Sequence, residues 1–196
     1  MRKAHPAIVV MLALAICLAG CSRKEEGPKY STFTSEESKF SVEVPKAYEN
    51  LEKSTSQADT EAGTLPMNIY FAEDSKGAYA VIESVFPVEL VQGHDAMKKV
   101  LQSSKNGMLG GSKPIKEEDT EVEGTPALYF RAVQQTGEGK DMYMDVKLFM
   151  LGGSMYQLQA VAYEEATLDA GGAEHFLNSF KYLGEDEEAA ESGEAN

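Results

Sequence analysis

The chain has 196 residues, of which 32 are acidic and 18 are basic, so its formal net charge at pH 7 is −14. This balance argues against nucleic-acid binding, which needs a basic footprint, and against electrostatic binding to anionic lipid headgroups. The length suits one domain with an adequate core, and 2 cysteines are too few for a disulfide framework.

An uncharged apolar run from Ala7 to Ala19 follows two basic residues at the N-terminus. The run is well short of the ~20 residues that cross a bilayer as a helix, so a cleavable secretory signal over residues 1–20 is favoured over a transmembrane anchor. Its ending, Leu18-Ala19-Gly20-Cys21, resembles the lipobox of bacterial lipoproteins, in which the cysteine is acylated before cleavage.

The lipobox resemblance implies that Cys21 becomes the first residue of the mature chain and carries fatty acyl chains, palmitate among them. Two or three chains on one residue give stable anchoring to a membrane, whereas one chain is marginal. Because Cys17 would leave with the signal, the mature chain would have no free thiol for a disulfide, a nucleophile or a redox motif.

We therefore expect a lipoprotein of the cell envelope that faces the periplasm or, in a Gram-positive cell, the extracellular side. Ser22 stands where many enterobacterial lipoproteins of the inner membrane have Asp. This difference favours the outer membrane over the inner one in a Gram-negative cell.

Polar segments flank a single expected domain over residues 30–183. Residues 21–29 comprise the lipidated cysteine and a spacer that Gly27-Pro28 makes flexible. Residues 184–196 carry six acidic and no basic side chains, so we expect a disordered tail. Removing residues 1–20 leaves 16 basic against 32 acidic residues, a charge of −16.

The first part of the domain is predicted to consist of strands. Apolar and polar residues alternate over 40–44, which indicates a strand that can pair as a hairpin with 30–34. Residues 51–64 are polar and show no clear period. Two further strands are expected over 66–71 and 79–86.

A helical segment is predicted to open at Asp95. Lys105 lies on the polar side of this segment, and Asn106-Gly107 and Gly110-Gly111 provide termination signals. Residues of the opposite side recur at helical spacing: Met97, Val100, Leu101, Ser104 and Met108.

The second half is predicted to be a series of hairpins over 113–121, 126–134, 142–151 and 155–163. We expect a final helix capped by Thr167. Its apolar residues Ala173, Phe176, Leu177 and Phe180 would face the core.

The strand over 142–151 has two unlike faces. Its even-numbered residues from Met142 to Met150 are apolar, whereas Tyr143, Asp145, Lys147 and Phe149 form a mixed face. Helices should therefore cover the sheet fully on one side and partly on the other. The fold class is predicted to be α+β, an antiparallel β-sheet flanked by helices.

The order of these elements resembles the PsbP-like fold of photosystem-associated PsbP proteins, a eukaryotic Ran-binding relative and DcrB-like bacterial lipoproteins. The matching segments are 40–45 (FSVEVP), 123–129 (EGTPALY), 152–158 (GGSMYQL) and 178–180 (NSF). The resemblance implies a PsbP-like α-β-α sandwich over residues 31–183, with a role in binding or assembly and without catalysis.

No pattern in the domain points to a catalytic or metal site. His94 and His175 lack metal-ligand spacing, and each is interpreted as a surface or helix-end residue. Gly152-Gly153-Ser154 is interpreted as a hairpin turn, and the acidic clusters at 117–119 and 164–165 as solvated surface. We therefore expect no cofactor, no bound metal and no enzyme activity.

These observations favour a lipid-anchored, non-catalytic module that binds or assembles with an envelope protein. The sheet face or a groove beside the helices would contact this partner, and the anchor would hold the chain on the membrane. The alternative is a small-molecule or lipid carrier or, ranked below it, a hydrolase, with a pocket between sheet and helices.

Overall fold

The computed structural model describes residues 29–60, 63–87, 89 and 91–184. The predicted signal over residues 1–20, Cys21, the spacer up to residue 28 and the tail from residue 185 lie outside the described residues.

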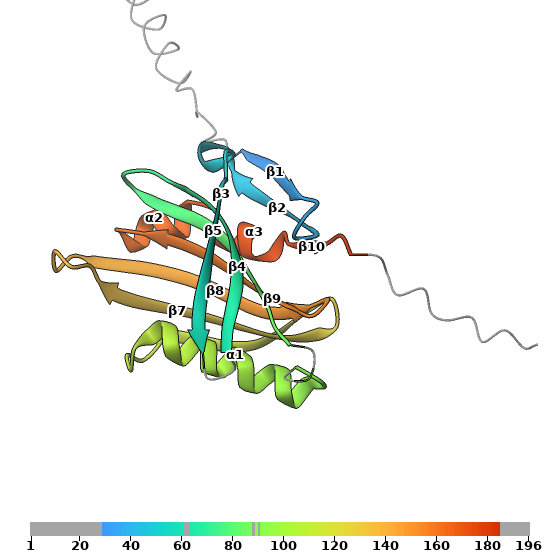
Figure 1. Ribbon diagram of the computed structural model, residues 1–196. Helices are drawn as coiled ribbons and strands as arrows, with labels where there is room; N and C mark the ends of the chain where they lie inside the picture. The colour runs from blue at the N-terminus through green and yellow to red at the C-terminus, as the bar shows by residue number, and fades with distance from the viewer. Residues whose placement is uncertain (1–28, 61–62, 88, 90, 185–196) are drawn as a thin grey trace, which may run out of the picture.

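A seven-stranded antiparallel sheet forms the centre of the domain (Figure 1). Consecutive strands are neighbours except that β5 pairs with β9, which places the two halves of the chain side by side. In spatial order the strands are β3 (Glu52–Thr60), β4 (Gly63–Glu73), β5 (Gly77–Val85), β9 (Ser154–Ala162), β8 (Asp141–Leu151), β7 (Thr125–Gln135) and β6 (Lys116–Val122).

A small second sheet joins the two ends of the described chain. The predicted hairpin forms as β1 (Tyr30–Ser35) and β2 (Phe40–Pro45), and β10 (Lys181–Tyr182) pairs with the other side of β2. A short 3-10 helix, η1 (Lys46–Tyr48), follows β2.

The long helix α1 (His94–Leu109) covers one face of the large sheet and contacts β7 and β8. It passes through Asn106-Gly107 and ends at Leu109, and the capping residue Gly110 adopts the left-handed conformation that suits glycine. Lys105, expected on the polar side, is buried and pairs with Glu117 of β6 at 2.7 Å.

The predicted final helix is wrong in its start and its continuity. The chain forms α2 (Glu165–Ala170) and α3 (Ala173–Asn178) instead, and α2 is preceded by Glu164, so Thr167 lies inside the helix and does not cap it. Gly172 separates the two at a φ of +88°, with the Tyr30 hydroxyl 2.6 Å from where a Cβ would lie. The expected apolar residues are nevertheless buried.

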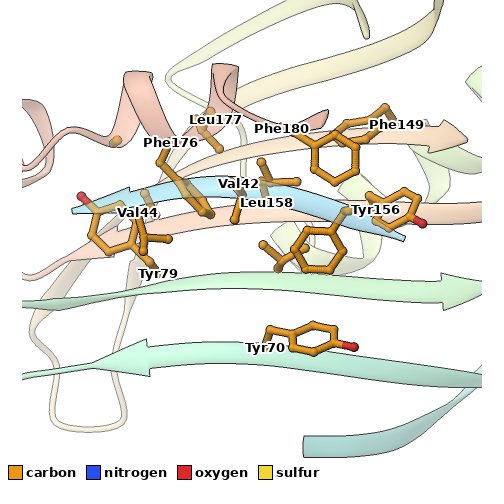
Figure 2. Close-up of a cluster of buried hydrophobic side chains, with 14 of the residues drawn as sticks. Val42, Val44, Tyr70, Tyr79, Phe149, Tyr156, Leu158, Phe176, Leu177 and Phe180 are labelled. Atoms are coloured by element: carbon orange, nitrogen blue, oxygen red, sulfur yellow. The ribbon is translucent and has the colours of Figure 1, made fainter. Parts of the chain in front are cut away.

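Two hydrophobic cores lie on the two faces of the large sheet. The first is enclosed by α1 and contains Leu128, Phe130 and the even-numbered residues of β8. The second is enclosed by β2, α2 and α3, and Figure 2 shows Val42, Phe176 and Phe180 packed over Tyr156 and Leu158 of β9.

Strand β3 was not expected, because residues 51–64 lack a hydrophobic period. Eight of its nine residues are exposed on an edge strand, where neither face needs apolar side chains. The pairing with β4, from Glu52 opposite Phe71 to Thr60 opposite Gly63, sets its conformation.

The structure therefore confirms the α+β class and the antiparallel sheet flanked by helices. The layers are α1, the large sheet, and a third layer in which α2 and α3 lie beside the small sheet (Figure 1).

Candidate functional site

A cavity of about 290 Å³, which we call the polar chamber, lies between β6, β7, β8 and α3. It is on the face of the sheet opposite α1. Its charged and polar lining is Lys116, Glu118, Thr120, Tyr129, Arg131, Asp145, Lys147, Glu174 and Asn178.

The register of the strands brings these side chains together. Arg131 of β7 lies opposite Asp145 of β8, and Tyr129 lies opposite both Lys147 and Glu118. Residues two apart on a strand share a face, so this row of polar side chains alternates with the apolar residues that face α1. The chamber is thus the polar continuation of the second core.

Arg131 and Asp145 form a bidentate ion pair at one side of the chamber. Arg131 donates through Nε and Nη2 to the two carboxylate oxygens of Asp145 at 2.7 and 2.8 Å, and Asp145 is 3% exposed. Tyr129 donates its hydroxyl to the same carboxylate at 2.9 Å.

This pair also connects the sheet to α2, because Nη2 of Arg131 donates to Asp169 at 2.7 Å. The hydrogen bond to Asp145 raises the pKa of Arg131, and burial followed by the hydrogen bond to Asp145 raises the pKa of Tyr129. Both groups keep their protons across the physiological range, and Arg131 is shared among the carboxylates of Asp145, Asp169 and, at 3.8 Å, Glu165.

Lys147 is the cation of the chamber that has no acid within ion-pair distance among the described residues. Its side chain is 8% exposed, and its Nζ donates to the amide oxygen of Asn178 at 2.7 Å. Among the described residues no carboxylate lies within 4.0 Å of this nitrogen. Burial lowers the pKa of Lys147 from its ordinary value.

Thr120 supplies a second unused polar group. Its hydroxyl is buried and has no hydrogen-bond partner in the described part of the chain. It lies on β6 opposite Ala127, whose small side chain occupies the row between Thr120 and Phe149. A buried cation, an unused hydroxyl and the amide group of Asn178 form a donor set that suits an anion such as a carboxylate.

By contrast, both oxygens of the buried Glu83 carboxylate accept hydrogen bonds from other side chains of the protein. It accepts hydrogen bonds from Asn68 and Ser154 at 2.9 Å and a further one from Ser38. Tyr156 donates to the carbonyl oxygen of Ser38 at 2.7 Å. This network connects the β1–β2 turn to the large sheet, and we assign it a structural role.

The residues singled out in the sequence do not come together. His94 begins α1, whereas His175 lies on α3, across the sheet, where it stacks on Tyr30 at 3.8 Å and pairs with Glu43. Gly152-Gly153 forms the turn between β8 and β9. The acidic residues 117–119 and 164–165 are exposed. Cys21 lies outside the described residues.

Two further structural findings concern membranes and metals. Within the described ranges, no helix has the length and apolar character needed to span a bilayer. The same ranges contain no group of three or more His, Cys, Asp or Glu side chains placed to hold a metal ion.

The sequence pattern predicts only part of the polar chamber. Asp145 and Lys147 were recognised as polar members of a mixed strand face, but Arg131, Thr120 and Asn178 were missed. The available signal was the pair of charges between Tyr143 and Phe149 in an otherwise apolar strand.

No protein-family model matches the sequence, and no curated protein is significantly similar to it. Among solved structures, the solution structure of cyanobacterial PsbP from Synechocystis sp. PCC 6803 is similar with a TM-score of 0.48 and 12% identity, covering 85% of this chain and 99% of that chain. A crystal structure from Bacteroides thetaiotaomicron VPI-5482 gives a TM-score of 0.48 and 14% identity, covering 81% of this chain and 49% of that chain.

A protein of unknown function from Pseudomonas aeruginosa is also similar, with a TM-score of 0.38 and 13% identity, covering 71% of this chain and 86% of that chain. A cyanobacterial PsbP is thus among the structures that this chain is similar to. At these identities the similarity concerns the fold and not the function.

Proposed function

We propose that the chain is a lipid-anchored, non-catalytic binding module of the cell envelope, and that its polar chamber receives a carboxylate of a protein partner. The observation that carries this proposal is Lys147, a buried cation whose ammonium group donates to an amide oxygen and has no carboxylate within 4.0 Å among the described residues. The unused hydroxyl of Thr120 in the same chamber supports it.

Electrostatics favours a carboxylate as the occupant. Removing an ammonium group from water costs several kcal/mol unless an opposite charge compensates for it. Arg131 is already occupied by the carboxylates of Asp145 and Asp169, so a carboxylate that enters would interact mainly with Lys147. Glu174 lines the chamber and would repel the same ligand.

The size of the chamber favours a small group over a lipid. Its volume of about 290 Å³ is just below the ~300–1,000 Å³ of ligand pockets. This is enough for the side chain of Asp or Glu or for the C-terminus of a partner chain, and too little for a long acyl chain.

Membrane attachment through Cys21 is a separate part of the proposal. Changing Cys21→Ala should abolish acylation and move the chain out of the membrane fraction of the cell, measured by fractionation and mass spectrometry. A variant that stays in the membrane fraction to the same extent would refute the lipoprotein interpretation without bearing on the chamber.

The partner is tested by photo-crosslinking in intact cells. A photoreactive residue replaces Glu174, an exposed side chain that lines the chamber, and adducts are identified by mass spectrometry. With Lys147→Met in the same chain, the adduct should fall by at least about thirtyfold, the loss expected when one member of a buried charge pair is truncated.

The matched control is Lys116→Met, which removes a more exposed cation of the same chamber that is already paired with Glu118 at 2.8 Å. It should leave the adduct within about twofold, because exposed ion pairs contribute little. The absence of a reproducible protein adduct, or equal losses with both lysine variants, would contradict the proposal.

A small-molecule carrier is the second candidate, favoured by the position of the chamber between sheet and helix. Native mass spectrometry of the mature chain released from detergent micelles should then show a co-purifying organic acid. This mass should be absent from the Lys147→Met variant and present in Lys116→Met. A bare mass for the unchanged chain would count against the carrier.

A further inference from the structure

The two edges of the large sheet differ in how open they are to another strand. Five of the seven residues of β6 are charged. Charged edge strands are a common device against unwanted pairing between sheets. The β3 edge lacks this protection, because its five central residues, Ser54 to Ala58, are uncharged and none is proline. This edge is therefore open to an added strand.

The charges near the ends of β3 select an occupant. In an antiparallel pair, residues that lie opposite each other point to the same face of the sheet. When a two-fold axis relates the two strands, it therefore lies midway between the two copies of one residue, and that residue is opposite itself. With the axis at Ser56, all nine residues pair, and Lys53 of each copy lies opposite Asp59 of the other. An axis at Thr55 or at Gln57 removes both of these charge pairs.

The side chains involved are available at the surface. Lys53 and Asp59 are exposed, and both lie on the face that carries Thr55 and Gln57. In the single chain Lys53 pairs with the exposed Glu37, and Asp59 accepts a hydrogen bond from Thr64 at 2.8 Å. A carboxylate from a second copy can join both groups, because ammonium and carboxylate each accommodate several partners.

We propose that β3 is a self-association edge, at which two copies of the chain pair their β3 strands antiparallel about Ser56 and join their large sheets into one. The proposal rests on the edge strand alone and does not depend on the polar chamber or on the lipid anchor.

Disulfide trapping in intact cells tests the register. Ser56 lies opposite itself across the axis, at a Cα separation of about 4.5–5.5 Å for directly opposed residues, which a disulfide can bridge. Ser56→Cys should therefore form a covalent homodimer on mild oxidation. Asp119→Cys, at the middle of β6, is the matched control on the charged edge, and the unchanged chain sets the background.

Charge reversal tests the pairing itself. In the Ser56→Cys chain, Lys53→Glu should lower the homodimer by about fivefold, because it places like charges opposite each other. Adding Asp59→Lys to that variant should restore the homodimer, since the charges are then exchanged and again complementary. Sedimentation velocity of the mature chains in detergent, without the added cysteine, should give the same ranking: less dimer for Lys53→Glu than for the unchanged chain, and a restored dimer when the charges are exchanged.

Equal trapping at Ser56 and Asp119 would overturn the proposal, as would a failure of the exchanged charges to rescue. A disulfide or adduct from Ser56→Cys to a different protein would also overturn it and would favour strand addition by another partner. All the altered positions are exposed, so the variants should fold.

Discussion

The two faces of β8 bury different kinds of side chain, apolar ones on one side and charged ones on the other. Residues 144, 146, 148 and 150 face α1 and are buried among apolar side chains, with Leu148 fully buried. On the opposite face Asp145 and Lys147 are almost as deeply buried, yet they line a polar chamber. Burial alone therefore does not distinguish a position in an apolar core from one that lines a polar cavity.

The two charges of the mixed face differ in whether the protein supplies an opposite charge beside them. Asp145 has a bidentate partner and a tyrosine hydroxyl, so its burial is compensated inside the protein. Lys147 has an amide oxygen and no acid among the described residues. The first arrangement is complete as it stands, whereas the second is the basis of the carboxylate site that we propose.

The largest effect should come from the apolar face. Leu148→Ala removes a fully buried side chain beneath α1 and should lower the free energy of unfolding by about 3 kcal/mol. Urea denaturation of the mature chain in mild detergent measures this. The control Leu183→Ala, at a side chain 48% exposed, should change it by about 0.5 kcal/mol or less. Similar losses at both positions would contradict the assigned core.

Asp145→Asn should have the next largest effect. It takes the compensating charge away from Arg131 and should lower the free energy of unfolding by about 2 kcal/mol, less than for a fully buried pair because Asp169 remains as an acceptor. Adding Arg131→Met should recover part of this loss in a double-mutant cycle. Strictly additive losses would show that the two residues do not act as a pair.

Lys147→Met should have a smaller effect of opposite sign. Replacing an uncompensated buried ammonium by an apolar side chain of similar length should raise the free energy of unfolding by about 1 kcal/mol. The same change should abolish binding in the chamber. A stabilised variant that no longer binds is the signature of a functional residue, and a destabilised one would contradict this role.

The pH dependence follows from the same residue. Burial lowers the pKa of Lys147 in the folded chain, so between that lowered pKa and the ordinary value of 10.5 the unfolded chain binds more protons. Stability should therefore rise with pH across this window in the unchanged chain, relative to the Lys147→Met variant. Denaturation midpoints of both chains at several alkaline pH values measure the difference, and parallel curves would contradict the assigned shift.

The smallest effect should come from Thr167→Ala. Thr167 lies within α2 and caps nothing, so the free energy of unfolding should change by about 0.5 kcal/mol or less. Removing a true helix cap costs about 1 kcal/mol, and a loss of that size would restore the original prediction of a cap at this position.

Much of the fold was predictable because local patterns decide it. Alternation over 40–44 and 142–151 identified strands with one buried face, and apolar residues at helical spacing identified α1. Strand β3 was not predictable, since an exposed edge strand carries no hydrophobic period. The break at Gly171-Gly172 was missed because a helical spacing of apolar residues persists across it.

The sequence by itself determined which residues seek burial, where turns occur and, through the lipobox resemblance, the expected attachment at Cys21. Only the tertiary structure decided which buried charges are compensated. Asp145 and Arg131 are paired by the register of β7 and β8, while Lys147 meets Asn178 from α3, far away in sequence. A charge is balanced or unbalanced according to its neighbours in space, and those depend on strand register and helix placement, which no local pattern encodes.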